Sequence, residues 1–307
     1  MKTLVVIPTY LEAENIADVL RRVRSVAPHA DVLVVDDSSS DGTADLARAA
    51  GEELGQIDVL VRPGKGGLGP AYRAGFEVGF SRGYEVLVQM DADLQHNPAS
   101  LPELLARVEE GADIAIGSRY VPGGETPNWP FRRRLLSRVA NVYASKVLGL
   151  KVHDATAGYR AYRADVLRVV VAEATKATGY GFQVELSYRA HRRGAKIVEV
   201  PITFNERVRG ESKMSWRIIG EAASVVTWWG LRDRLFGFWR RRPEPVARTS
   251  STTATVTAAS EAASSGASEA PAASTPAANP DHDGAGRADG AAGGDGAPAP
   301  ADATSEA

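Results

Sequence analysis

The sequence has 307 residues, no cysteine and a formal net charge of −2 at neutral pH. The absence of cysteine excludes a disulfide framework and a thiolate metal site, and it fits a reducing compartment. No run of eighteen apolar residues is present, and the apolar run near Met1 ends at Pro8, so we expect neither a transmembrane helix nor a signal peptide.

The C-terminal part of the chain differs in composition from the rest. Residues 246–307 consist mainly of Ala, Ser, Thr, Gly, Pro and Asp and contain no Phe, Trp or Tyr. They hold eight acidic and two basic residues, a net charge of −6, which leaves +4 on residues 1–245. Such a segment buries too little apolar surface to offset the entropy of ordering, so we expect a disordered tail.

Short apolar runs alternate with helical patterns through the first 120 residues. The predicted strands are Leu4–Ile7, Val32–Val35, Val59–Val61, Glu85–Met90 and Asp113–Ser118, and the predicted helices are Glu14–Val26, Gly42–Ala50, Gly69–Phe80 and Leu101–Glu109. This alternation predicts an α/β fold, in which helices cover both faces of a mostly parallel sheet. Ligands of such sheets bind at the carboxyl ends of the strands, so the polar residues after each strand are the candidate functional residues.

The second half of the chain is less regular. Predicted helices cover Leu135–Leu148, Val166–Val171 and Phe182–Arg192, and a strand covers Ile197–Pro201. The long pattern Trp216–Trp239 combines aromatic and aliphatic residues with Arg232 and Arg234. It indicates either a helix that packs back on the domain or an interfacial helix at the level of lipid headgroups.

Two carboxylates follow the fourth predicted strand, in the run Asp91-Ala92-Asp93-Leu94-Gln95-His96. Two close carboxylates repel each other unless a cation lies between them, and their oxygens suit Mg²⁺ or Mn²⁺. Gln95 offers a further oxygen, and His96 is either a third ligand or a packed ring. The alternative for the pair is a solvated Asx turn, but its place at a strand end favours a metal site.

Polar and glycine-rich segments follow the other strands. Tyr10 and Glu12 come after the first strand, and Asp36-Asp37 after the second, where Asp37 suits the N–H groups of a base or a ribose hydroxyl. The loop Arg62–Gly69 lacks the ending of a P-loop, and its Lys65 is a candidate phosphate contact.

Basic residues gather in loops after the fifth strand and later in the chain. They lie in Ser118-Arg119-Tyr120, in Arg132-Arg133-Arg134 and in Arg207–Lys213. Arginine suits bidentate phosphate contacts, and lysine acts as a point charge. Beside a proposed metal site, this set indicates an anionic substrate.

Several motifs in this order resemble the dolichyl/polyprenyl-phosphate mannosyltransferases of glycosyltransferase family 2. They are Pro8-Thr9-Tyr10-x-Glu12, Asp36-Asp37-Ser38-Ser39-x-Asp41-Gly42-Thr43, Asp91-Ala92-Asp93-Leu94-Gln95-His96-x-Pro98, Gly117-Ser118-Arg119-Tyr120 and Arg207-x-x-Gly210-x-Ser212-Lys213. The resemblance covers about residues 1–220. One departure is Leu11, where the family usually has Asn, and we expect it to have little effect because Tyr10 and Glu12 flank it.

The resemblance implies a GT-A fold and an inverting transfer of mannose from GDP-mannose to a polyprenyl monophosphate. It implies that the nucleotide-sugar site comprises Pro8, Tyr10, Glu12, Val35, Asp37, Asp91, Ala92, Asp93, Gln95, Arg119, Arg207 and Lys213. It places Mg²⁺ or Mn²⁺ on Asp91, Asp93 and Gln95, and the acceptor phosphate on Arg119, Arg133 and Ser137. The residues expected to be catalytic are Asp93, Arg119 and Arg207.

The acceptor phosphate is an anion at neutral pH, which explains why the sequence offers no clear general base. Alternatives are transfer of glucose or another hexose from a UDP- or GDP-sugar, and a non-catalytic nucleotide-sugar-binding subunit. A nucleotidyltransferase is disfavoured because a glycine-rich triphosphate loop is missing near the N-terminus. We expect a cytoplasmic enzyme, peripheral at the inner face of the membrane, without a nucleic-acid partner; a membrane-protein partner stays open.

These observations predict three segments. Residues 1–213 form the GT-A catalytic domain, residues 214–245 an amphipathic helical segment, and residues 246–307 the disordered tail.

Overall fold

The computed structural model describes residues 1–173, 180–206 and 216–236. The strands are β1 (Thr3–Thr9), β2 (Asp31–Asp36), β3 (Ile57–Val61), β4 (Val86–Gln89), β5 (Ile114–Ser118), β6 (Arg160–Arg163) and β7 (Ile197–Pro201). The helices are α1 (Ile16–Val26), α2 (Thr43–Leu54), α3 (Leu68–Ser81), η1 (Pro98–Ser100), α4 (Leu101–Glu109), α5 (Phe131–Leu148), α6 (Ala164–Glu173), α7 (Tyr180–Arg192) and α8 (Trp216–Phe236).

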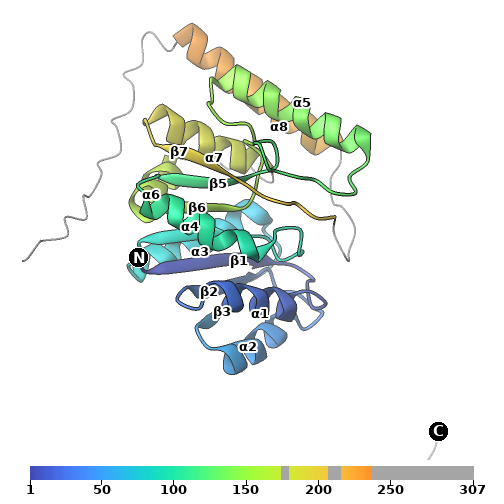
Figure 1. Ribbon diagram of the computed structural model, residues 1–307, viewed down its shortest axis with the longest axis vertical. Coiled ribbons are helices and arrows are strands. Elements are labelled where there is room, and N and C mark those ends of the chain that lie inside the picture. Colours follow the sequence, from blue (N-terminus) through green and yellow to red (C-terminus); the bar gives the residue numbers. More distant parts are fainter. Residues whose placement is uncertain (174–179, 207–215, 237–307) are drawn as a thin grey trace, which may run out of the picture. The chain divides into compact units, whose positions relative to one another are not determined.

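The described strands form one sheet in the order β3-β2-β1-β4-β6-β5-β7 (Figure 1). Neighbouring strands are parallel except β6, which is antiparallel to both β4 and β5. The predicted mostly parallel α/β sheet is therefore confirmed. The sequence pattern does not predict β6, because its four residues begin and end with arginine and look like a loop. Because β4 and β5 are both antiparallel to β6, they run in the same direction, and their carboxyl ends lie at the same edge of the sheet.

Helices cover both faces of the sheet (Figure 1), and buried hydrophobic side chains fill the space beneath them. On one face, α1, α2 and α4 bury side chains such as Ile16, Leu20 and Leu104. On the other face, α3, α6 and α7 bury side chains such as Phe76 and Leu167. The apolar spacing of α1, at i, i+3, i+4 and i+7, directs one face of the helix into this core.

Two glycines let α3 approach the sheet closely. A Cβ atom at Gly75 would lie 2.3 Å from Val6 Cγ1 on β1, and one at Gly79 would lie 2.3 Å from Leu87 Cδ2 on β4. Real side chains do not approach so closely, so the contact between this helix and the central strands depends on glycine.

α8 packs back on the domain, as one of the two interpretations of Trp216–Trp239 predicts. A Cβ atom at Gly230 would lie 2.5 Å from Val147 Cγ1 on α5, and the ring of Trp229 stacks on Tyr188 of α7 with centroids 5.8 Å apart. Asp233 accepts a hydrogen bond from Arg192 of α7 at 2.7 Å.

The outward face of α8 is apolar and uncovered within the described residues. Trp228, Leu231 and Leu235 are 61%, 49% and 61% exposed. The interfacial interpretation therefore stays a prediction for this face. None of the described helices combines the length and the hydropathy needed to cross a bilayer.

Candidate active site

The acid pair lies just beyond the carboxyl end of β4. Tyr72 of α3 donates a hydrogen bond from its hydroxyl to Asp91 Oδ1 at 2.7 Å, and the amide of Gln95 donates to Asp93 Oδ1 at 3.1 Å. Leu94, between Asp93 and Gln95, adopts a left-handed conformation with φ 61°, so the chain turns sharply after Asp93. Asp93 thus forms the Asx turn of the alternative interpretation, but the residue is buried and not solvated.

Tyr72 is a site residue that the sequence does not reveal. Complete burial, and next the charge of Asp91, raise the pKa of Tyr72 well above its ordinary value, so the phenol stays protonated and donates a hydrogen bond to Asp91. Nothing in the pattern of α3 distinguishes this tyrosine from an ordinary core residue.

The ring of His96 is packed, which is one of the two roles that the sequence allows. It stacks on Tyr159 with centroids 5.2 Å apart and meets Phe204 edge-on at the same distance. Its Nδ1 accepts a hydrogen bond from the amide of Asp91 at 3.2 Å. His96 therefore helps to position the backbone of the acid pair.

The ligand types at this edge fit a hard divalent cation that substrate phosphates complete. Gln95 is buried and donates from Nε2 to the carbonyl of Asn205 at 3.1 Å, an arrangement that fixes its side-chain amide. No group of three or more His, Cys, Asp or Glu side chains gathers in a metal-binding arrangement among the described residues. Two carboxylates with one amide oxygen are a set that suits Mg²⁺ or Mn²⁺ with nucleotide phosphates as the remaining ligands.

Gly158 leaves room for the acid pair. A Cβ atom at this position would lie 3.3 Å from Asp91 Oδ2 and 3.4 Å from His96 Cε1. The loop before β6 thus contacts Asp91 through a residue without a side chain.

Three of the residues predicted for the nucleoside, Tyr10, Glu12 and Asp37, follow β1 and β2, as expected. Asp37 pairs with Arg62 and accepts from the amides of Gly66 and Gly67 at 2.9 and 3.1 Å. The amine of Lys65, in the same glycine-rich loop, lies 4.1 Å from the ring centroid of Tyr10. The structure therefore brings this loop against the predicted nucleoside residues.

Other predicted nucleoside residues have local structural roles. Pro8 and Val35 are buried within β1 and β2. Glu12 accepts from the side-chain amide of Asn15 at 2.9 Å, and its backbone carbonyl accepts from the amide of Ile16, so it organises the start of α1.

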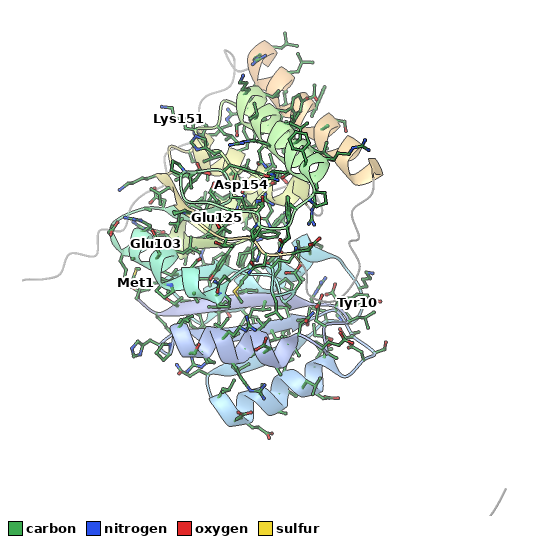
Figure 2. The ribbon with its side chains drawn as sticks, turned by 45° about the vertical axis from the view of Figure 1, so that its right-hand side comes forward. Met1, Tyr10, Glu103, Glu125, Lys151 and Asp154 are labelled. Atoms are coloured by element: carbon green, nitrogen blue, oxygen red, sulfur yellow. The ribbon has the colours of Figure 1, made fainter. Side chains whose placement is uncertain are left out.

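Arg119, at the end of β5, forms a buried bidentate ion pair. Its Nε and one terminal nitrogen each donate to Asp154 at 2.7 Å, its amide donates to the same carboxylate at 3.0 Å, and Thr156 accepts a further bond at 2.9 Å. Burial alone would raise the pKa of Asp154, but the charge and hydrogen bonds of Arg119 outweigh it and hold that pKa below its ordinary value. In the view of Figure 2, Asp154, which pairs with Arg119, lies above Tyr10, one of the predicted nucleoside residues.

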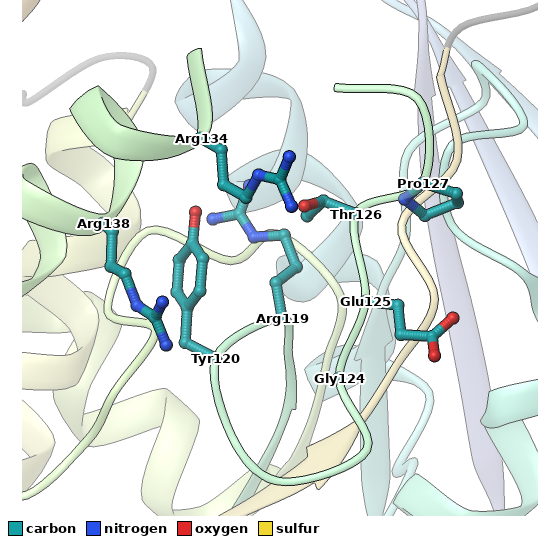
Figure 3. A pocket seen from close by; sticks show the side chains of 8 residues that line it. All are labelled: Arg119, Tyr120, Gly124, Glu125, Thr126, Pro127, Arg134 and Arg138. Atoms are coloured by element: carbon teal, nitrogen blue, oxygen red, sulfur yellow. The ribbon is translucent and has the colours of Figure 1, made fainter. Parts of the chain in front are cut away.

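A cavity of about 340 Å³ opens beside Arg119 (Figure 3). Its lining comprises Arg119, Tyr120, Gly124, Glu125, Thr126, Pro127, Arg134 and Arg138. Of the predicted acceptor-phosphate residues, Arg119 lines this cavity, and Ser137 accepts a hydrogen bond from the Tyr120 hydroxyl at 2.7 Å. Arg133 is not part of this lining: its guanidinium carbon lies 3.9 Å from the ring centroid of Trp129.

Arg160, at the start of β6, fixes the loop that carries Asp154 and Gly158. It is completely buried and donates to the carbonyls of Ala155 and Ala157 at 2.7 Å each. It also donates to the carbonyl of Gln183 on α7 at 3.0 Å. The sequence does not single out Asp154 and Gly158, because the position of their loop beside β4 and β5 depends on the following strand β6, which the sequence does not predict.

Arg207 and Lys213 lie outside the described residues. Their predicted roles with the nucleotide sugar stay predictions.

Comparison with known proteins shows the family to which the chain belongs. Residues 4–171 match the family described as Glycosyl transferase family 2. The chain belongs to this family. This family 2 glycosyltransferase is 52% identical over 241 residues to the undecaprenyl-phosphate mannosyltransferase of Micrococcus luteus. The aligned region covers 78% of this chain and 99% of that protein.

A second relative has the same level of identity. The polyprenol monophosphomannose synthase of Mycolicibacterium smegmatis is 52% identical over 235 residues, covering 76% of this chain and 89% of that protein. The fold is similar to that of a mannosyltransferase from Pyrobaculum calidifontis in complex with GDP-Man and Mn²⁺, with a TM-score of 0.53, 18% identity, and coverage of 79% of this chain and 66% of that one. The predicted family and the predicted enzyme class, a glycosyltransferase, are confirmed.

Proposed function

We propose that this glycosyltransferase transfers mannose, with inversion, from GDP-mannose to a polyprenyl monophosphate. The observation that carries the proposal is one loop that touches two different sites. Gly158 lies against the acid pair, and Asp154, four residues earlier, binds Arg119 at the cavity. Four residues span at most about 14 Å, so a leaving diphosphate at the acids and an acceptor phosphate at the arginines can meet across one sugar.

The relatives supply the chemical identity of the substrates. Proteins with 52% identity over most of this chain are named for mannose transfer to undecaprenyl phosphate and to a polyprenol monophosphate. The names match what the site offers, which is carboxylates for a cation and guanidiniums for a phosphate.

The protein's contribution to the reaction is positioning and charge. The acceptor phosphate is already an anion, so no side chain has to remove a proton from it. Asp91, Asp93 and Gln95 would hold Mg²⁺ or Mn²⁺, which when bound stabilises the negative charge that develops on the departing GDP. Arg119, fixed by Asp154, holds one side of the acceptor site in place.

A lipid acceptor needs a surface that meets the membrane, and we propose that α5 and α8 provide it. On α5, Phe131, Leu135 and Val139 are 70%, 49% and 56% exposed at four-residue spacing, which places them on one face. This helix has basic residues and no acidic one. Its apolar face adjoins that of α8, because Tyr143 of α5 hydrogen-bonds Thr227 of α8.

This surface is larger than the sequence predicts, since the sequence places the interfacial segment at 214–245 alone. An apolar face with cationic neighbours suits the anionic inner leaflet of a cell membrane. The cytoplasmic, peripheral location belongs to the same proposal.

The test is incubation of the purified protein with polyprenyl phosphate and labelled GDP-mannose or UDP-glucose, with Mg²⁺, with Mn²⁺ and with a chelator. We expect a mannosyl phospholipid only from GDP-mannose and only with a divalent ion. Asp93→Asn should abolish transfer at an unchanged melting temperature, whereas Asp45→Asn, at an exposed position of α2, should keep full turnover. Preference for UDP-glucose, or transfer in the chelator, would contradict the proposal.

A further inference from the structure

Two guanidiniums in the acceptor cavity have no assigned role in the reaction described above. Arg134 and Arg138 lie one turn apart on α5 and both line the cavity. Neither forms an ion pair with a carboxylate elsewhere in the described part of the chain. Glu125 is the acidic member of the lining, and like Arg134 and Arg138 it is exposed.

The balance of charge in the cavity depends on these two residues. The positive charge of Arg119 is compensated by the buried carboxylate of Asp154, which its lowered pKa keeps ionised. Arg134 and Arg138 supply the two remaining positive charges of the lining, and Glu125 offsets one of them, so the lining keeps a net positive charge.

Tyr120 links these guanidiniums to the predicted acceptor residues. Its ring centroid lies 5.3 Å from the guanidinium carbon of Arg119 and 5.8 Å from that of Arg138. Its hydroxyl donates to Ser137 Oγ, which leaves the hydroxyl proton of Ser137 for another acceptor. Figure 3 shows the ring of Tyr120 between the side chains of Arg119 and Arg138.

The proposed reaction changes the charge of the group in this cavity. An oxygen of the acceptor phosphate bonds to C1 of mannose, the bond from C1 to the diphosphate oxygen breaks, and that oxygen keeps the electron pair. No proton is exchanged. A phosphomonoester carries a charge of about −1.5 to −2 at neutral pH, whereas the phosphodiester product carries one negative charge. One negative charge thus leaves the acceptor phosphate and appears on GDP.

We propose that Arg134 and Arg138 recognise the acceptor as a phosphomonoester dianion and favour release of the product because it is a monoanion. Tyr120 acts as a positioning residue that holds Arg138 and Ser137 toward the phosphate. The proposal rests on the proposed function, but it concerns binding and is measurable without turnover.

The experiment compares a short prenyl phosphate with its methyl ester, a phosphodiester of the same chain. Calorimetric titration with farnesyl phosphate and farnesyl methyl phosphate, below their micelle concentrations, removes the membrane from the measurement. The wild type should bind the monoester about tenfold more tightly, the value of one charge-assisted contact. This preference should weaken from pH 7 to pH 5, because the second phosphate proton binds near pH 6.

Arg134→Gln and Arg138→Gln should each reduce the preference for the monoester to about threefold or less. Arg138→Lys keeps the charge and should keep most of the preference. The matched control is Arg132→Gln, an exposed arginine of the same helix outside the cavity lining, which should bind both ligands like the wild type. Tyr120→Phe should weaken binding of the monoester and leave little further effect for Ser137→Ala in the double variant.

An unchanged preference in both glutamine variants, at an unchanged melting temperature, would overturn the proposal. So would equal affinity of the wild type for the two ligands. If the wild type shows the preference but transfers no mannose from GDP-mannose, the assignment of Arg134 and Arg138 stands and the proposed function fails.

Discussion

The two halves of the sheet differ in what holds them together. From β3 to β4, the strands are apolar and parallel, every residue of β1 is buried, and α3 packs on them through Gly75 and Gly79. From β6 to β7, the neighbouring loops are fixed by charged side chains, above all the Arg119–Asp154 pair and Arg160. Asp37 and Arg62 also fix a loop in the β3–β4 half (the nucleotide half), but both arginines that are buried among the described residues, Arg119 and Arg160, belong to the β6–β7 half (the acceptor half).

This difference suits two kinds of substrate. A nucleotide needs a rigid edge to bind against, which the fully buried strand β1 provides. An acceptor phosphate needs a few charges at defined places, which loops supply only if other charges fix them. A substitution should therefore disturb the first half through volume and the second through charge.

The largest effect is expected from breaking the buried pair of the acceptor half. Asp154→Asn leaves Arg119 buried without its counter-charge and should lower the free energy of unfolding by about 3–5 kcal/mol. Asp45→Asn, which breaks a surface pair with Arg48, should cost less than about 1 kcal/mol. Urea unfolding of the two variants checks the comparison, and equal stabilities would contradict it.

The same pair predicts how stability depends on acidity. Because the folded-state pKa of Asp154 lies below its ordinary value of 3.8, the pair's contribution is fully present above about pH 4 and is lost as the pH falls below that value. Asp154→Asn should remove that part of the acid sensitivity, as measured by unfolding at pH 3 and pH 6.

The next effect concerns volume in the nucleotide half. Gly75→Ala places a methyl group within 2.3 Å of Val6 Cγ1 and should destabilise the domain by about 1–3 kcal/mol. The matched control is Gly220→Ala, a helical glycine of α8 with open space around it, which should be neutral or stabilising. A neutral Gly75→Ala would show that α3 can move away from the sheet.

A smaller change, at Gly158 in the loop that contacts both halves, should lower activity without lowering stability. In Gly158→Ala, the added methyl lies 3.3 Å from Asp91 Oδ2, so the carboxylate must shift by a few tenths of an ångström. We expect kcat/KM for transfer to fall by about tenfold, since small displacements of reacting groups are costly. The melting temperature should stay close to that of the wild type, and normal turnover at varied Mn²⁺ would argue that Asp91 has another role.

The smallest effect concerns Leu11, where the resembling family usually has Asn. Leu11 is 47% exposed and adopts φ 60°, a left-handed conformation that Asn accepts more readily than Leu. Leu11→Asn should therefore stabilise the protein by about 0.5–1 kcal/mol. The comparably exposed Leu46 of helix α2 is the control, because Leu46→Asn should destabilise slightly.

Sequence reasoning succeeded where a local pattern determines the structure. The strands that precede Tyr10, Asp37 and Asp91 follow from apolar runs bounded by polar residues, and the carboxyl edge follows from parallel topology. It failed at β6, whose four residues carry no periodic signal. With β6 missing, the loop of Asp154 and Gly158 could not be placed beside β4 and β5.

The partners of side chains also lay beyond the sequence. The sequence predicts Arg119 as a phosphate ligand, but nothing near it in the chain indicates that Asp154 accepts hydrogen bonds from two of its guanidinium nitrogens. The resemblance implies Arg133 for the acceptor phosphate, yet only the turn of α5 decides that Arg134 and Arg138 line the cavity. Such choices depend on contacts between residues far apart in sequence.

Arg160 has a consequence for how the enzyme responds to its surroundings. The residue fixes the loop that spans the two substrate sites, and a guanidinium keeps its proton at every pH that a cell experiences. A histidine in that place would lose its charge near neutrality and release the loop. Under the proposed function, the spacing of donor and acceptor should therefore not vary with cellular acidity, and the pH profile of the enzyme should follow the ionisation of its substrates.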